Sequence, residues 1–160
     1  QVHRAIDEAL RDGHLSEQTA GRIATAMDLS AEETSAKLDR LTRAYDGQRN
    51  AALAEMGIRG ETAELFSNFM ELHADKVNAA LRQQFTNGNL NAFRELATEF
   101  WTGYVPYAAP EIIVDAAKAS GLDAWFDRMS DRVILKLEDG STVDYKAALA
   151  SGLIKTPTFA

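Results

Sequence analysis

The chain has 160 residues, of which 46% are hydrophobic and 26% are charged, and its formal net charge is −7 at pH 7. This composition is typical of a folded domain with a hydrophobic core, and the absence of cysteine excludes disulfides, thiolate metal sites and a cysteine nucleophile. Acids outnumber bases by nine to six in 1–46, seven to five in 47–109 and eight to six in 110–160, which disfavours nucleic acid and anionic membranes as partners.

No apolar run approaches the roughly 20 residues that cross a bilayer, and no basic-then-apolar leader precedes the first predicted helix. We therefore expect no membrane segment and a location in the cytoplasm or inside a particle. The chain opens on Gln1 without a methionine and closes on Thr-Pro-Thr-Phe-Ala, so we expect both ends to be cut from a longer protein.

The segment 16–43 has the spacing of a helix-turn-helix and follows a first helix predicted over 2–11. Ser16 is placed to cap a helix that runs to about Met27, and the turn should occupy 28–30. The apolar residues expected to bury these two helices are Ile23, Ala24, Met27, Leu29, Leu38 and Leu41.

Ser30 and Glu33 have the form of a capping box, which predicts a long helix over 30–56 with a possible break or kink at Asp46-Gly47. The charge of this helix does not suit DNA. Glu32 and Glu33 stand where a DNA-reading helix offers Arg, Lys, Asn or Gln to base edges. If the segment did bind DNA, the phosphate contacts would have to come from Arg22, Lys37, Arg40 and Arg43.

Apolar residues at three- and four-residue steps predict one helix over 61–86, and a second helix from Asn91 that Pro106 closes. Pro110 suits the first position of a further helix, which should run to Gly121. Asp123 is then placed to cap a last helical turn, which would carry Trp125, Phe126 and Met129.

After Ser130 the hydrophobic period changes to two, which predicts a β-hairpin. Of two registers, a two-residue loop at 139–140 and a three-residue loop at 138–140, we prefer the second. It places Gly140 at positive φ and pairs Leu135 with Val143 and Val133 with Tyr145. A short helix from Lys146 to Ser151 should follow, with Leu153 and Ile154 packing back.

These elements predict a mainly α fold. We expect a bundle-like body of six or seven helices over 1–129, and over 130–160 a small β-hairpin with a short helix. A hairpin alone is marginal in water, so this one should lie on the helical body or on a partner. One edge of the outer strand near Thr142–Tyr145 should keep unpaired backbone groups and invite a partner strand.

Searches for catalytic chemistry give no constellation. The residues at i±3 and i±4 of His73 are Phe69, Met70, Lys76 and Val77, none of which suits a helical metal pair, so we expect a partly buried, hydrogen-bonded histidine. Asp127 and Asp131 would share a helix face, and we interpret them as surface ion-pair partners. We expect no catalytic, cofactor or metal site.

The aromatic residues between 85 and 126 allow two interpretations, a helical core or an exposed docking patch. Our leading hypothesis is a non-enzymatic protein-interaction or assembly protein, such as an adaptor, an inhibitor or a component of a larger particle of the virion kind. Its partner would be another protein or a second copy. The alternative is a regulator that binds or mimics DNA through 16–43. The residues predicted to contact a protein partner are Trp101, Tyr104, Tyr107, Val143 and Tyr145.

Overall fold

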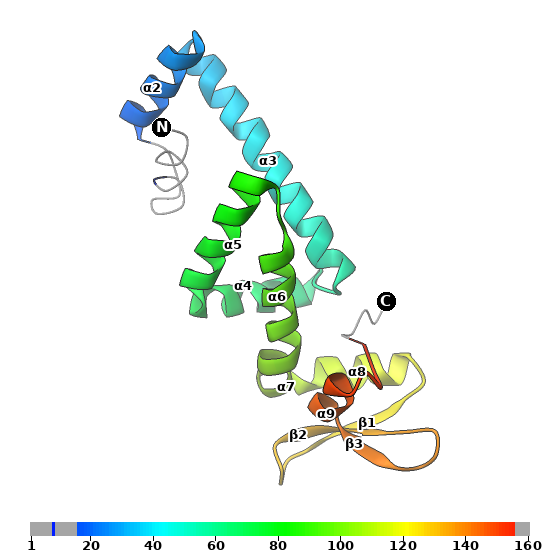
Figure 1. Ribbon diagram of the computed structural model, residues 1–160. Coiled ribbons are helices and arrows are strands. Elements are labelled where there is room, and N and C mark those ends of the chain that lie inside the picture. Colours follow the sequence, from blue (N-terminus) through cyan, green and yellow to red (C-terminus); the bar gives the residue numbers. More distant parts are fainter. Residues whose placement is uncertain (1–7, 9–15, 156–160) are drawn as a thin grey trace. The chain divides into compact units, whose positions relative to one another are not determined.

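The computed structural model describes Glu8 and residues 16–155, which form mainly helices and one small antiparallel sheet (Figure 1). This confirms the predicted fold class. The chain divides into two compact units, one made of 1–52 and 74–93 and the other of 53–73 and 94–160. The helix predicted over 2–11 lies outside the described residues, except for Glu8, which is helical.

The first unit contains the helix-turn-helix segment, and both predicted helices form, α2 over Glu17–Met27 and α3 over Ala31–Glu55. Ser16 caps α2, accepting a hydrogen bond from the Thr19 N–H at 3.2 Å. The capping box closes on α3, because the Glu33 N–H donates to Ser30 Oγ at 3.2 Å and the Ser30 N–H donates to Glu33 Oε2 at 2.9 Å. Hydrogen bonds from the Ser30 N–H and hydroxyl lower the pKa of the Glu33 carboxyl.

Helix α3 runs without interruption through Asp46-Gly47, so the possible break there does not occur. The predicted burial of Met27 and Leu41 is wrong, since their exposed fractions are 56% and 50%. Contacts of α3 with α5 (Ala74–Asn87) begin one turn beyond Leu41. There the Tyr45 and Phe85 rings meet edge to face at 4.7 Å, and Gln84 Nε2 donates to the Tyr45 carbonyl at 2.8 Å.

The single helix predicted over 61–86 is wrong, because the chain breaks at His73. Helix α4 covers Glu61–Leu72, His73 adopts φ −124° and ψ 37°, and α5 begins at Ala74. The apolar pattern continues across the break because each half has its own core to face, α4 in the second unit and α5 in the first. A periodic pattern alone does not distinguish one long helix from two helices in series.

Pro106 does not close its helix as predicted. Helix α6 (Asn91–Glu99) continues into a π-helical turn, η1 (Phe100–Tyr104), and then into α7 (Val105–Ala108), which contains Pro106 in its first turn. The Val105 N–H donates to the Phe100 carbonyl, the wide hydrogen bond of a π-turn. Pro110 then begins α8 (Pro110–Ala119), as predicted.

An aromatic cluster forms the core between α4 and η1. Phe66, Phe69 and Phe100 are at most 3% exposed, and the Phe100 ring lies 5.1 Å from Phe66 and 5.7 Å from Phe69. Beside them, Trp101 is 2% exposed and its indole Nε1 donates to the Met56 carbonyl at 2.8 Å. These contacts tie two segments that are about 45 positions apart in the chain into one core.

The C-terminal region is a three-stranded sheet in the order β1-β2-β3, which extends the predicted hairpin by one strand. The helical turn predicted over 123–129 is wrong, because this segment forms β1 and its turn, and the expected boundary at 129/130 falls inside that turn. The elements are β1 (Asp123–Asp127), β2 (Arg132–Lys136), β3 (Thr142–Asp144) and α9 (Tyr145–Ala150).

The predicted three-residue loop is confirmed. Leu135 pairs with Val143, the Leu137 N–H donates to the Ser141 carbonyl at 2.8 Å, and Gly140 has a φ of +82°. The expected pairing of Val133 with Tyr145 is wrong, because β3 ends at Asp144. Its carboxylate caps α9 by accepting from the Ala147 N–H at 3.1 Å, and this draws Tyr145 into the helix.

One face of the sheet is covered by helices. Helix α8 packs on β1 and β2, and α9 packs on β2 and β3, with Ala124, Val133 and Leu135 buried beneath them (Figure 1). The sheet thus lies on helices, as its marginal size requires. The short helix after the hairpin is confirmed, but Leu153 does not pack back, since it is 59% exposed.

Replacing Phe69 or Phe100 by alanine should lower the free energy of unfolding by about 3–5 kcal/mol each, because a buried ring leaves a cavity. Leu72→Ala is the matched control, since Leu72 is 69% exposed on the same helix as Phe69 and its loss should change stability by less than about 0.5 kcal/mol. Urea unfolding measures all three, and equal midpoints for Phe69→Ala and Leu72→Ala would contradict the described core.

Two glycines should respond in opposite directions to alanine. An added Cβ would meet nothing within 4 Å at Gly140 or at Gly47. The effect of alanine on stability therefore depends on the backbone conformation at each position. Gly140→Ala forces an L-residue to positive φ and should lower stability by about 1–2 kcal/mol, whereas Gly47→Ala lies inside α3 and should raise it by about 0.5–1 kcal/mol. Thermal melting compares them, and a Gly140→Ala variant as stable as wild type would disprove the assigned turn.

Candidate functional site

The five residues predicted to contact a protein partner do not form one patch. Trp101 and Tyr145 are 2% and 1% exposed and serve the core, Tyr104 and Val143 are half-buried, and Tyr107 is exposed. A continuous aromatic docking patch is therefore excluded. Trp101 and Tyr145 are buried and not exposed as predicted, because they contact residues distant in the sequence. Helical spacing does not reveal such contacts.

The π-turn borders an open groove of about 280 Å³ within the second unit. Two aromatic rings form much of its wall, with Phe69 centred 5.4 Å from Tyr104, and the half-buried His73 ring packs 4.4 Å from Phe69. The volume is slightly below the roughly 300–1,000 Å³ typical of ligand pockets. The remaining lining residues are Glu99, Thr102 and Gly103.

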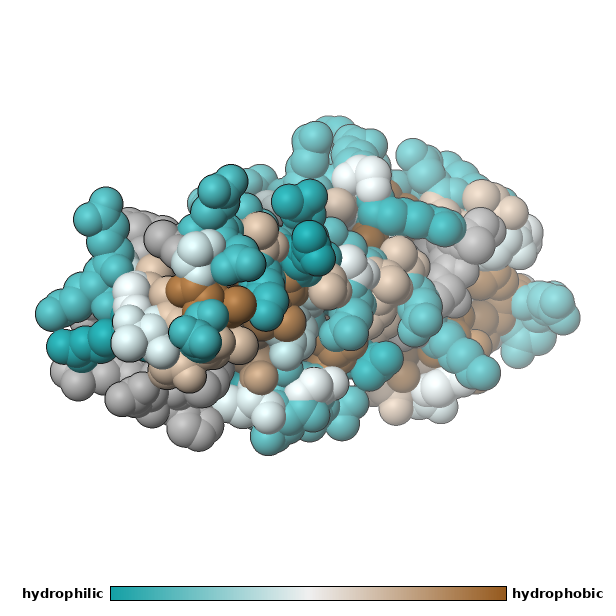
Figure 2. Space-filling model, turned by 90° about the horizontal axis from the view of Figure 1, so that it is seen from above, coloured by the Kyte–Doolittle hydropathy of each residue, from teal (hydrophilic) through white to brown (hydrophobic). Residues whose placement is uncertain are grey.

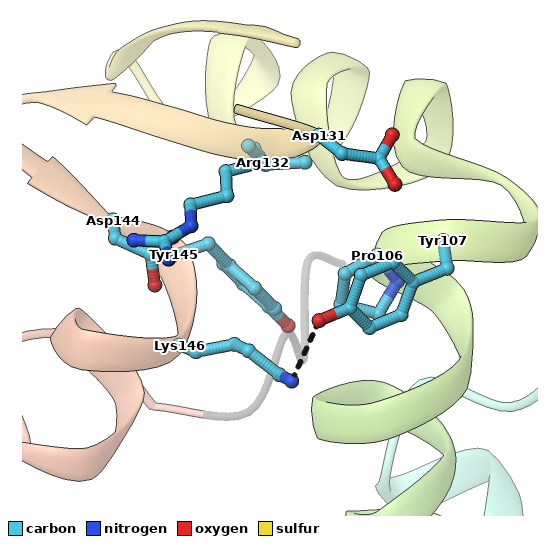
Figure 3. Close-up of a pocket in the computed structure, with 8 residues that line it drawn as sticks. Pro106, Tyr107, Asp131, Arg132, Asp144, Tyr145 and Lys146 are labelled. Carbon is cyan, nitrogen blue, oxygen red and sulfur yellow. Dashed lines mark hydrogen bonds and ion pairs between the residues drawn. The ribbon is translucent and has the colours of Figure 1, made fainter. Parts of the chain in front are cut away.

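A second, water-sized hollow of about 10 Å³ lies between α7 and the end of β3 (Figure 3). Lys146 Nζ donates to the Tyr107 hydroxyl at 3.0 Å and lies 4.9 Å from the centre of its ring. The Tyr145 hydroxyl points toward this pair, yet it is buried and has no hydrogen-bond partner among the described protein groups. Burial raises the pKa of Tyr145 well above its usual value.

Acids and bases alternate around this hollow. Arg132 Nε lies 3.9 Å from Asp144 Oδ2, and Asp144 also caps α9, while Asp131 lies on the opposite side of the hollow (Figure 3). With Lys146, these residues comprise two cations and two carboxylates, so their formal charges cancel. The hollow therefore has no excess of positive charge to select an anion.

Tyr145→Phe should raise the free energy of unfolding by about 1 kcal/mol, because a buried hydroxyl without a partner carries a desolvation cost that phenylalanine removes. Tyr107→Phe is the control, since its hydroxyl is exposed and its removal should change stability by less than about 0.5 kcal/mol. Urea titration measures both. A Tyr145→Phe variant less stable than wild type would show that this hydroxyl is hydrogen-bonded in solution.

The sheet face opposite the helices carries apolar residues that the helices of the second unit leave uncovered. Trp125 is 40% exposed and pairs across the strands with the half-buried Ile134, and Met129 in the β1–β2 turn is 98% exposed. Strand alternation places charged residues on either side of this pair. We call Asp123, Trp125 and Asp127 the acidic row, and Arg132, Ile134 and Lys136 the basic row.

Both hairpin turns are held by an aspartate. Asp127 accepts from the Ser130 hydroxyl at 2.6 Å and the Met129 N–H at 3.0 Å, and Asp139 accepts from the Ser141 hydroxyl and N–H. These hydrogen bonds lower the pKa of both carboxyls, the serine hydroxyl having the larger effect in each turn. Asp127 therefore does not share a helix face with Asp131, contrary to the sequence prediction. The rows are fixed in register by turns that close locally.

The outer edge of β3 is a shorter docking edge for a partner strand than the sequence predicts. The Leu137 to Ser141 hydrogen bond sets the alternation, so the backbone groups of Val143 face β2 and those of Thr142 and Asp144 face the open side. The strand has three residues, and its last one is engaged in capping α9. A partner strand would find only a short edge here.

In the first unit, the four basic residues considered for DNA binding are all exposed. Lys37 lies close enough to Glu33 for its charge to contribute to the lowered pKa of that carboxyl. Figure 2 shows a face on which hydrophilic side chains predominate and hydrophobic ones form small groups between them. Exposed acids and exposed bases are interspersed along α2 and α3. The basic residues considered are Arg22, Lys37, Arg40 and Arg43.

Within the described part of the chain, no three His, Asp or Glu side chains gather in a way that could hold a metal ion. Nor does any helix there combine the length and apolar character needed to span a membrane. No family model, curated protein or solved structure matches the chain. Any functional inference must therefore come from the surface of the molecule itself.

Proposed function

We propose that this chain is a non-enzymatic protein-interaction or assembly protein, and that it binds its partner through the outward face of the C-terminal sheet. The role would be that of an adaptor, an inhibitor or a component of a larger particle such as a virion. The observation that carries the proposal is the cross-strand pair of Trp125 and Ile134, which no helix of the second unit covers.

Two features of this face favour a protein partner. Tryptophan and methionine are enriched in protein interfaces, and Trp125 and Met129 are both exposed on the β1–β2 hairpin. Charged residues surround the apolar pair, which resembles the polar rim around the apolar centre of a protein interface. The backbone that presents them is a paired sheet held on α8, so little order has to be gained on binding.

DNA binding by 16–43 is not part of this proposal. The four exposed basic residues share their helices with exposed acids, and Glu32 and Glu33 occupy the start of the second helix. Phosphate contacts need a local excess of positive charge, which this segment lacks.

The proposal is tested by capturing the tagged full chain, after mild cross-linking, from the cells or particles that contain it. The variant Trp125→Ser with Ile134→Ser should lose its bound protein at least tenfold, because the apolar centre of the face is removed. The control, Leu41→Ser with Leu153→Ser, removes two exposed apolar side chains elsewhere and should keep its partner. Equal recovery of the same proteins by both variants would refute the proposal, provided that melting shows both to be folded.

A further inference from the structure

We infer that the partner of the sheet face is a second copy of this chain, docked face to face about a two-fold axis parallel to the strands. This inference rests on the proposed function, because it names the occupant of the same surface. It is carried by the charge arrangement, since the acidic row and the basic row are neighbours in register on one exposed face.

The register makes the face self-complementary. Asp123 lies beside Lys136, Trp125 beside Ile134, and Asp127 beside Arg132. A two-fold axis that runs midway between β1 and β2 exchanges these two strands between the copies. The acidic row of each copy then lies over the basic row of the other, and the indole of each copy lies over the isoleucine of its partner. Such an isologous contact is the commonest closed symmetry of homo-oligomers.

The same charges exclude the other face-to-face arrangement. A two-fold axis perpendicular to the strands would place Asp123 of one copy over Asp127 of the other, and Arg132 of one copy over Lys136 of the other. Like charges brought together destabilise a complex, whereas opposite charges stabilise it. The two rows therefore favour the axis parallel to the strands over the axis perpendicular to them. Two sheets packed face to face about 10 Å apart leave room for the longer basic side chains to reach the aspartates.

The size of the face predicts a weak contact. Because the axis lies between β1 and β2, only these two strands of each copy overlap; five residues at about 3.4 Å and two strands about 4.8 Å apart cover roughly 17 by 10 Å, well below the ~800 Å² that each partner gives to a standard interface. The dissociation constant should therefore be about 0.1–1 mM. Sedimentation equilibrium of the full chain at concentrations across this range measures it.

Charge reversal tests the arrangement. Two variants each reverse the charge of one row, and we call them half-swapped chains. The first carries Asp123→Lys with Asp127→Lys, and the second carries Arg132→Glu with Lys136→Glu. Each places like charges over one another in its own dimer, so each should self-associate at least tenfold more weakly than wild type. A mixture of the two places opposite charges over one another at every position, and it should form a heterodimer.

A fully swapped chain with all four substitutions is the control for folding. It keeps opposite charges as neighbours between β1 and β2, as in wild type, although Arg132→Glu places a carboxylate beside Asp144; the folded chain should self-associate like wild type. Weak association of each half-swapped chain, with recovery in their mixture and in the fully swapped chain, is a pattern that a defect in monomer stability does not produce. Thermal melting of each variant verifies its fold.

A wild-type chain that remains monomeric near 1 mM overturns the inference. So does a half-swapped chain that associates like wild type, or a mixture that forms no heterodimer. Failure here is distinguishable from failure of the proposed function. If partner capture still depends on Trp125 while the chain stays monomeric, the face binds a different protein. If capture does not depend on Trp125, both proposals fail.

Discussion

The second unit depends on how a helical chain passes Pro106. Proline has no N–H to donate to the carbonyl four residues earlier, and its ring clashes with that carbonyl in a regular helix. The chain widens into a π-turn over Phe100–Tyr104, and the Val105 N–H reaches back to the Phe100 carbonyl. Phe100 and Trp101 remain buried before the proline and Val105 remains buried after it. The apolar stripe is thus maintained although the helical hydrogen bonds change.

The continuation past Pro106 gives the second unit its later contacts. Helix α7 brings Tyr107 to Lys146 of α9 and leads into α8, on which the sheet packs. The wide turn also presents Thr102, Gly103 and Tyr104 to the groove beside α4. π-turns often occur at functional sites, because the extra residue redirects side chains that a regular helix would aim elsewhere. Here the redirected side chains border an open groove of about 280 Å³.

Sequence reasoning succeeded where the signal was local. The caps at Ser16 and Ser30, the helix start at Pro110 and the positive φ of Gly140 all depend on residues within four positions of one another. Such hydrogen bonds and backbone limits operate whatever the rest of the chain does. The helices and the second hairpin were therefore predictable together with their order.

The failures share a different cause. The segment Asp-Ala-Trp-Phe-Asp at 123–127 is compatible with a helical turn, and only its pairing with β2 makes it a strand. The break at His73 follows from the separation of α4 and α5 into different units. The Trp101 indole is buried, and it donates a hydrogen bond to the Met56 carbonyl, 45 positions away. These features depend on tertiary contacts, and local periodicity does not contain them.

The missed strand is also what creates the candidate interface. With β1 treated as helix, its alternating acids and tryptophan have no neighbour; with β1 paired to β2, they lie beside two bases and an isoleucine. Opposite charges across strands stabilise the monomer modestly, so the face is compatible with a folded single chain. The same rows penalise the face-to-face contact of two copies about an axis perpendicular to the strands. In the proposed dimer, a small face of this kind contributes orientation more than strength.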